Sequence, residues 1–163
     1  TLQSIQAAAQ TAYRQAIAAS EWSIHKIPLS ARPQVVGEYT SPMVRPFDVM
    51  SPGEINETLT KISQLLKVSD KIVQTSATAI TTETESWFVS SNGSEVYQKF
   101  LLIGTDFAAT AQEGSIIQRR SNNGWLARCY QGGMEHFITP DLWARVEQIG
   151  AQAVELLTAE ECP

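Results

Sequence analysis

The chain has few of the residues that disulfide and metal sites require. Its 163 residues include two cysteines, Cys129 and Cys162, and two histidines, His25 and His136. Two cysteines do not make a disulfide framework in a chain of this length, so we expect reduced thiols and a cytoplasmic location. Zinc needs three or four converging donors, and no His-Glu-x-x-His motif, cysteine pair or carboxylate cluster lies near either histidine. We therefore predict no metal ligand in this segment.

Signals for membranes, secretion, nucleic acids and phosphates are also missing. No run of about 18 apolar residues occurs, so we expect no membrane span, and no secretion signal is visible. The net charge of −5 and a single adjacent basic pair, Arg119-Arg120, argue against nucleic-acid binding. Gly124 and Gly132-Gly133 fit neither phosphate-loop motif, and no Gly-x-Ser-x-Gly elbow exists. We predict no catalytic and no cofactor-binding residue.

What remains is the composition of one folded domain. The chain is 43% hydrophobic and 18% charged, which is ordinary for a globular protein long enough to bury a core. We therefore take residues 1–163 as a single domain. The sequence starts without methionine directly in a helical pattern and stops just after another, so we expect a segment of a larger bacterial protein.

Helical patterns open the chain, follow its proline-rich part and close it. An alanine-rich helix is predicted from Thr1 to about Ala19, and a second helix begins at the capping box Ser51-Pro52-Gly53-Glu54. Thr139-Pro140-Asp141 caps a closing helix over 140–158. Between the first two helices, residues 21–50 form a proline-rich arm with a short extended stretch near Val35. Its many apolar residues indicate that it packs on its own domain or on a partner.

Residues 72–120 alternate with a period of two, which is typical of strands. Asn92-Gly93 signals a type I′ hairpin, and Gly104-Thr105-Asp106 and Glu113-Gly114 are expected to turn the chain. Short turns force antiparallel neighbours. We predict an α+β fold in which an antiparallel β-meander of about five strands packs against two to three helices. The predicted strands are 72–80, 86–90, 95–103, 107–111 and 115–120.

Two functional readings of individual residues stay open. Cys129 and His136 could form a thiol enzyme, although a packed or surface cysteine is the more ordinary interpretation. The nearly uncharged strand Ile72–Ile80 could be a sheet edge that accepts a peptide as an added strand, although such strands are more often central. Glu83 and Glu85 share one strand face, which we interpret as a solvated strand end. The four tryptophans are expected to anchor the core or an interface.

Several strings resemble one family. Phe88-Val89-Ser90-Ser91-Asn92-Gly93, followed by alternating strands and Ala111-Gln112-Glu113-Gly114, resembles the N-terminal domain of the TldD/PmbA proteins, once called modulators of DNA gyrase and now regarded as metallopeptidases. Gly132-Gly133, followed by a capped helix and the string from Ala153 to Ala159, is similar to the same family. The arm before the helix at Ser51 also looks like the family's insertion.

The resemblance implies a function only for a longer protein. Zinc-binding members of the family carry a His-Glu-x-x-x-His helix and a later cysteine in a C-terminal domain, and no residue of this chain matches that motif. The resemblance therefore implies a non-catalytic scaffold domain of a metallopeptidase that acts on unfolded peptides, with zinc in the full-length parent. Its implied partners are the C-terminal catalytic domain of the same chain and a second subunit in a homo- or heterodimer. A peptide- or protein-binding module unrelated to proteolysis remains the alternative.

Overall fold

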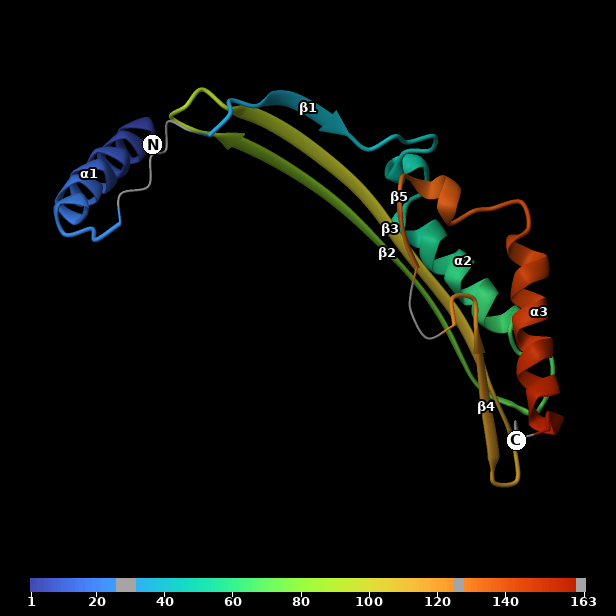
Figure 1. Ribbon diagram of the computed structural model, residues 1–163. Coiled ribbons are helices and arrows are strands. Elements are labelled where there is room, and N and C mark those ends of the chain that lie inside the picture. The colour runs from blue at the N-terminus through green and yellow to red at the C-terminus, as the bar shows by residue number, and fades with distance from the viewer. Residues whose placement is uncertain (26–31, 125–127, 161–163) are drawn as a thin grey trace.

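A computed structural model describes residues 1–25, 32–124 and 128–160 as three α-helices and one five-stranded sheet, with three short 3-10 helices. Figure 1 shows two long, curved strands running through the molecule, with helices beside their lower half. The elements in chain order are α1 (Leu2–Glu21), β1 (Val36–Thr40), η2 (Phe47–Val49), α2 (Pro52–Leu65), β2 (Ile72–Val89), β3 (Glu95–Glu113), β4 (Ile116–Ser121), β5 (Arg128–Gln131), η3 (Met134–His136), α3 (Leu142–Glu155) and η4 (Leu156–Thr158).

β3 is the central strand of the sheet. Along one edge it pairs with β2 in antiparallel register, from Val89 opposite Glu95 to Ile72 opposite Ala111. Along its other edge it pairs in turn with β1, β5 and β4. The α+β class is therefore confirmed, but the sheet is mixed, because β1 runs parallel to β3. The prediction of a purely antiparallel meander was wrong on this point.

Four of the five predicted strands merge into two. The segment Gly104-Thr105-Asp106 does not turn the chain, because Gly104 pairs with Ile80 on one side and with Cys129 on the other. Hydrogen bonding along both edges outweighs the local turn preference of glycine and aspartate. The threonine-rich segment 81–85 likewise continues β2 without a break. The turn at Glu113-Gly114 and the following strand β4 were predicted correctly.

The Asn92-Gly93 hairpin exists, but its turn differs from the predicted type. Its loop spans residues 90–94, and only Gly93 has a positive φ, of 86°. A type I′ turn requires positive φ at both central residues. Asn92 instead accepts a hydrogen bond from the Ser94 N–H through its side-chain oxygen, at 3.1 Å. This Asx-type contact stabilises the loop in place of a left-handed backbone.

The hydrophobic core lies between one face of the sheet and the helices α2 and α3. Gly150 of α3 approaches α2 so closely that a Cβ atom there would lie 2.4 Å from the carbonyl oxygen of Leu66. The capping box at Ser51 and Glu54 is present at the start of α2. The largest fully buried side chains are those of Phe107, Phe137, Ile62, Leu66, Ile103, Met134, Leu142 and Val146.

Three further features differ from prediction. Every residue of α1 is exposed, and the helix lies beyond the hairpin end of the ribbon, apart from α2 and α3 (Figure 1). Of the two to three helices predicted to pack on the sheet, α2 and α3 do so and α1 does not. α3 begins at Leu142, because residues 139–141 form a turn in which the Leu142 N–H bonds the Thr139 carbonyl. β5 was not predicted. None of the described helices is long and apolar enough to cross a bilayer.

Two isoleucines test this arrangement of the core. Ile103 on β3 is fully buried, whereas Ile117 on β4 is 59% exposed. We expect Ile103→Ala to lower the free energy of unfolding by about 2–5 kcal/mol, because it leaves a cavity beneath the helices. The same change at Ile117 is expected to cost less than about 1 kcal/mol. Urea denaturation of both variants measures the difference, and equal losses would contradict this placement of the core.

Candidate functional site

The structure separates the two residues of the proposed thiol site. Cys129 pairs with Gly104 and Tyr130 with Ile103, so their side chains project to opposite faces of β5. The His136 ring stacks on Tyr130, with centroids 4.9 Å apart and planes within 8°. The imidazole therefore lies on the Tyr130 side of the strand, away from Cys129. This geometry does not provide the thiol–imidazole contact that nucleophilic catalysis needs.

The described residues do not fit a zinc site. No group of three or more His, Cys, Asp or Glu side chains comes close enough together, within residues 1–25, 32–124 and 128–160, to hold a metal ion. His25 is exposed beyond the end of α1, and Cys162 lies outside the described residues. We therefore derive no metal-dependent step for this segment.

Glu135 in η3 ties the proline-rich arm to the loop before α3. Its carboxylate accepts hydrogen bonds from the backbone N–H groups of Arg45 at 2.8 Å, Gly133 at 2.9 Å and Val44 at 3.3 Å. Burial would raise the pKa of Glu135, but these backbone donors together outweigh burial and lower the pKa to about 2. Glu135 is thus a half-buried anchor whose carboxylate accepts hydrogen bonds from the chain's own backbone.

Gly133 completes the same contact. A Cβ atom at this position would lie 1.9 Å from the carbonyl oxygen of Arg45, which accepts a hydrogen bond from the Met134 N–H at 2.9 Å. The absence of a side chain at Gly133 therefore permits a close approach of the two backbone segments. The arm is held here by direct backbone contact, as a part of the domain.

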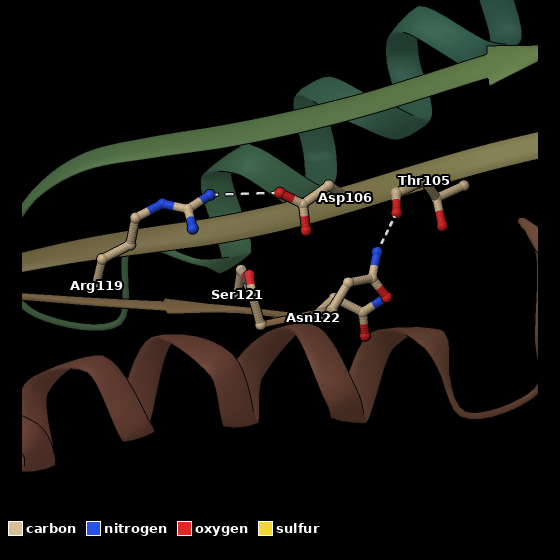
Figure 2. A network of polar contacts seen from close by, with 7 residues as sticks. Thr105, Asp106, Arg119, Ser121 and Asn122 are labelled. Atoms are coloured by element: carbon tan, nitrogen blue, oxygen red, sulfur yellow. Dashed lines mark hydrogen bonds and ion pairs between the residues drawn. The ribbon is translucent and has the colours of Figure 1, made fainter. Parts of the chain in front are cut away.

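The pair Arg119-Arg120 belongs to polar contacts within the fold. Figure 2 shows Arg119 of β4 reaching the carboxylate of Asp106 on β3, at 3.3 Å. Arg120 points to the other face, where its Nε donates to the side-chain oxygen of Gln152 on α3 at 2.8 Å. Both guanidinium groups therefore have partners in the chain itself.

No part of α2 or α3 covers the half of the β2–β3 ribbon nearest the hairpin. We call the residues 81–89 of β2 and 95–99 of β3 the open ribbon. On the face that α2 and α3 cover farther along, the Trp87 and Tyr97 rings stand opposite each other with centroids 4.9 Å apart. Trp87 is 66% exposed. The two rings line a shallow hollow of about 400 Å³ together with Val36, Gly37, Glu38 and Glu95.

Glu83 and Glu85 flank a lysine on the same face. Lys99 Nζ lies 2.5 Å from Glu83 Oε1 and 3.1 Å from Glu85 Oε1. These contacts, the one to Glu83 first, raise the pKa of Lys99 above its usual value. The two carboxylates share a strand face, as predicted, but they lie inside β2 and not at a strand end. One cation from the neighbouring strand, Lys99, offsets half of their charge.

Among the strands that the structure describes, none lies along the outer edge of β2. β2 is the last strand in the order β1-β3-β2, and Figure 1 shows no element along its free side. The interpretation of residues 72–80 as a sheet edge is therefore consistent with the structure, whereas a central position is not. Whether a peptide binds there is a separate question.

A sequence model described as the PmbA/TldA metallopeptidase central domain matches residues 45–159. The chain belongs to the PmbA/TldD metallopeptidase family. The match confirms the resemblance, and it describes a central domain, whereas we had compared the chain with the N-terminal part of these proteins. No curated protein matches the chain.

The family match includes the core, β2 to β5 and the Glu135 anchor, but not α1 or β1. Sequence reasoning missed Glu135 and Lys99 as organising residues. A signal existed for Lys99, because a single lysine lies on a strand predicted beside Glu85. Glu135 gave no comparable signal, because its donors come mainly from a segment 90 positions earlier in the chain.

The low pKa of Glu135 predicts acid sensitivity. A carboxyl group whose pKa is lower in the folded state stabilises the fold above its unfolded pKa, and this contribution is lost as pH falls from about 4.5 toward 2. We expect Glu135→Gln to lower stability at pH 7 by roughly 2 kcal/mol, since an amide replaces a charged acceptor. The loss should shrink as the pH approaches 2. Urea denaturation at pH 7, 4 and 2.5 measures this.

Glu113 provides the matched control. Its carboxylate, 52% exposed, pairs with Lys71 at 2.8 Å on the surface. We expect Glu113→Gln to change stability by less than about 0.5 kcal/mol at any of these pH values. Equal effects of the two substitutions at pH 7 would show that Glu135 is not an anchor.

Proposed function

We propose that this chain is a non-catalytic scaffold domain of a cytoplasmic PmbA/TldD-type metallopeptidase. The observation that carries the proposal is the match of residues 45–159 to the central domain of that family. A central domain has neighbours on both sides in its parent, and the proposal assigns zinc and the catalytic residues to a C-terminal domain of the same protein. In this proposal the described residues contact the catalytic domain and the second subunit and help to shape the cavity between them.

The open ribbon supports a role in enclosing a cavity between two subunits. It is an extension whose two strands hydrogen-bond to each other along its length, yet its exposed aromatic and aliphatic side chains are not covered by α2 or α3. Exposed apolar surface of this kind usually marks contact with another domain or subunit. In the proposed enzyme, two subunits enclose a cavity whose entrances admit unfolded peptides and exclude folded proteins.

Ligand substitutions in the intact protein test this assignment. We expect His25→Ala, His136→Phe and Cys129→Ser, combined in one variant, to leave zinc content and cleavage of an unfolded peptide unchanged. Phenylalanine at position 136 preserves the stacking on Tyr130. Metal analysis and a peptide cleavage assay on the intact protein, with its partner subunit where it has one, provide the readout.

Two results would contradict the proposal. Loss of zinc together with cleavage in the combined variant, while its fold remains intact by circular dichroism, would place metal ligands in this domain. An intact wild-type assembly that holds no zinc and cleaves no unfolded peptide would remove the peptidase assignment altogether.

A further inference from the structure

The free edge of β2 is unusually long and almost uncharged. It spans 18 residues, or roughly 60 Å at about 3.3 Å per residue. From Ile72 to Thr82 it contains no charged side chain. Farther along, Glu83 and Glu85 are paired with Lys99 of β3. The edge therefore offers a neutral row of backbone donors and acceptors over most of its length.

The usual protective devices are missing from this edge. Natural edge strands are kept apart by lysine, proline, bulges or short length. β2 has no lysine and no proline, and its one irregularity lies at its start, between Ile72 and Gln74. Ile80, in the middle of the strand, projects a β-branched side chain that is 62% exposed. An edge with these properties is a template for pairing with another strand.

We propose that β2 pairs with β2 of a second copy of this chain, antiparallel and about a two-fold axis at Ile80. The two sheets then form one continuous sheet through the dimer. An edge of about 60 Å is matched over its whole length by an identical edge, whereas a short extended peptide covers only part of it. The inference shares with the proposed function only the expectation of a dimer.

Ile80 lies at the middle of β2, so this register pairs nearly the whole edge, and the charges of β2 are compatible with it. With Ile80 opposite Ile80 of the other copy, Glu83 faces Ala77 and Glu85 faces Thr75, so no carboxylate meets another. A parallel, in-register pair would set each glutamate against itself, and an antiparallel pair centred on Thr84 would set Glu83 against Glu85. Like charges directly opposite each other destabilise a strand pair.

The same register brings exposed and covered surfaces together. Thr78 faces Thr82 of the other copy, which is a favourable cross-strand pair of β-branched residues. Because the strands run in opposite directions, the open ribbon of each copy lies beside the helix-covered half of the other. Trp87 then lies near Val73 of the other copy, and both side chains are more than half exposed in the single chain.

Cysteine cross-linking tests the register in the intact protein, in a background with Cys129→Ser and Cys162→Ser. We expect Ile80→Cys to form a disulfide-linked dimer under mild oxidation, because directly opposite Cα atoms lie about 4.5–5.5 Å apart. Thr84→Cys alone should not cross-link, since its own copy would lie about 26 Å away along the strand. A mixture of Ser76→Cys and Thr84→Cys proteins should form the mixed dimer. Ile117→Cys, on exposed β4, is the control for random collision.

Sedimentation of a charged variant provides a second, independent measurement. Ile80→Lys should raise the dimer Kd by roughly 100-fold or more, since two like charges would meet at the axis. Ile117→Lys should leave the Kd unchanged. Absence of the Ile80→Cys cross-link in a dimer that persists with Ile80→Lys would overturn the pairing, while leaving the peptidase assignment intact. A wild-type monomer that loses retention of an unfolded peptide on Ile80→Lys would assign the edge to the peptide and would equally overturn it.

Discussion

The pairing of β2 with β3 is the interaction on which the rest of the structure depends. β3 hydrogen-bonds to β2 along one edge and to β1, β5 and β4 along the other, so each strand is positioned by its register on β3. The helices then cover only the half of this ribbon where β3 carries Ile103, Phe107, Ala109 and Ala111 on one face. Small alanines there allow α3 to approach the sheet closely. Beyond Leu101 the same face becomes polar and aromatic, and the helices end.

Local sequence patterns predicted which helices and strands exist better than they predicted where each one begins and ends. The capping box at Ser51, the apolar stripes of α2 and α3 and the hairpin at residues 90–94 were all readable, because each depends on residues a few positions apart. The turn predicted at Gly104 and Asp106 was wrong, because the preference of these residues for turns is weaker than hydrogen bonding on both edges of β3. The parallel pairing of β1 and the existence of β5 depend on partners far away in the sequence, and no local pattern records them.

The candidate site residues also divide into those whose placement follows from local patterns and those whose placement depends on distant parts of the chain. The separation of Cys129 from His136 follows from strand alternation, and it required only the knowledge that β5 exists. Glu135 could not be assigned from sequence, because a carboxylate that anchors backbone N–H groups looks like any loop glutamate until those groups converge on it. The proline-rich arm is a related case. Its apolar character indicated contact with the domain or with a partner, and the structure shows that near residue 45 the arm's backbone contacts the Glu135 carboxylate and the Met134 N–H.

The parallel attachment of β1 has a consequence for how the chain folds. Val36 pairs with Glu95 across 59 positions, whereas the β2–β3 hairpin closes through a five-residue loop over residues 90–94. Loop-closure entropy favours the local contact, so the hairpin forms early and β1 docks onto a finished edge of β3. During synthesis, the proline-rich arm therefore has to wait until β3 has left the ribosome. Until then the backbone donors and acceptors of β1 stay without their partner strand, although β1 is made before the strand that pairs with it.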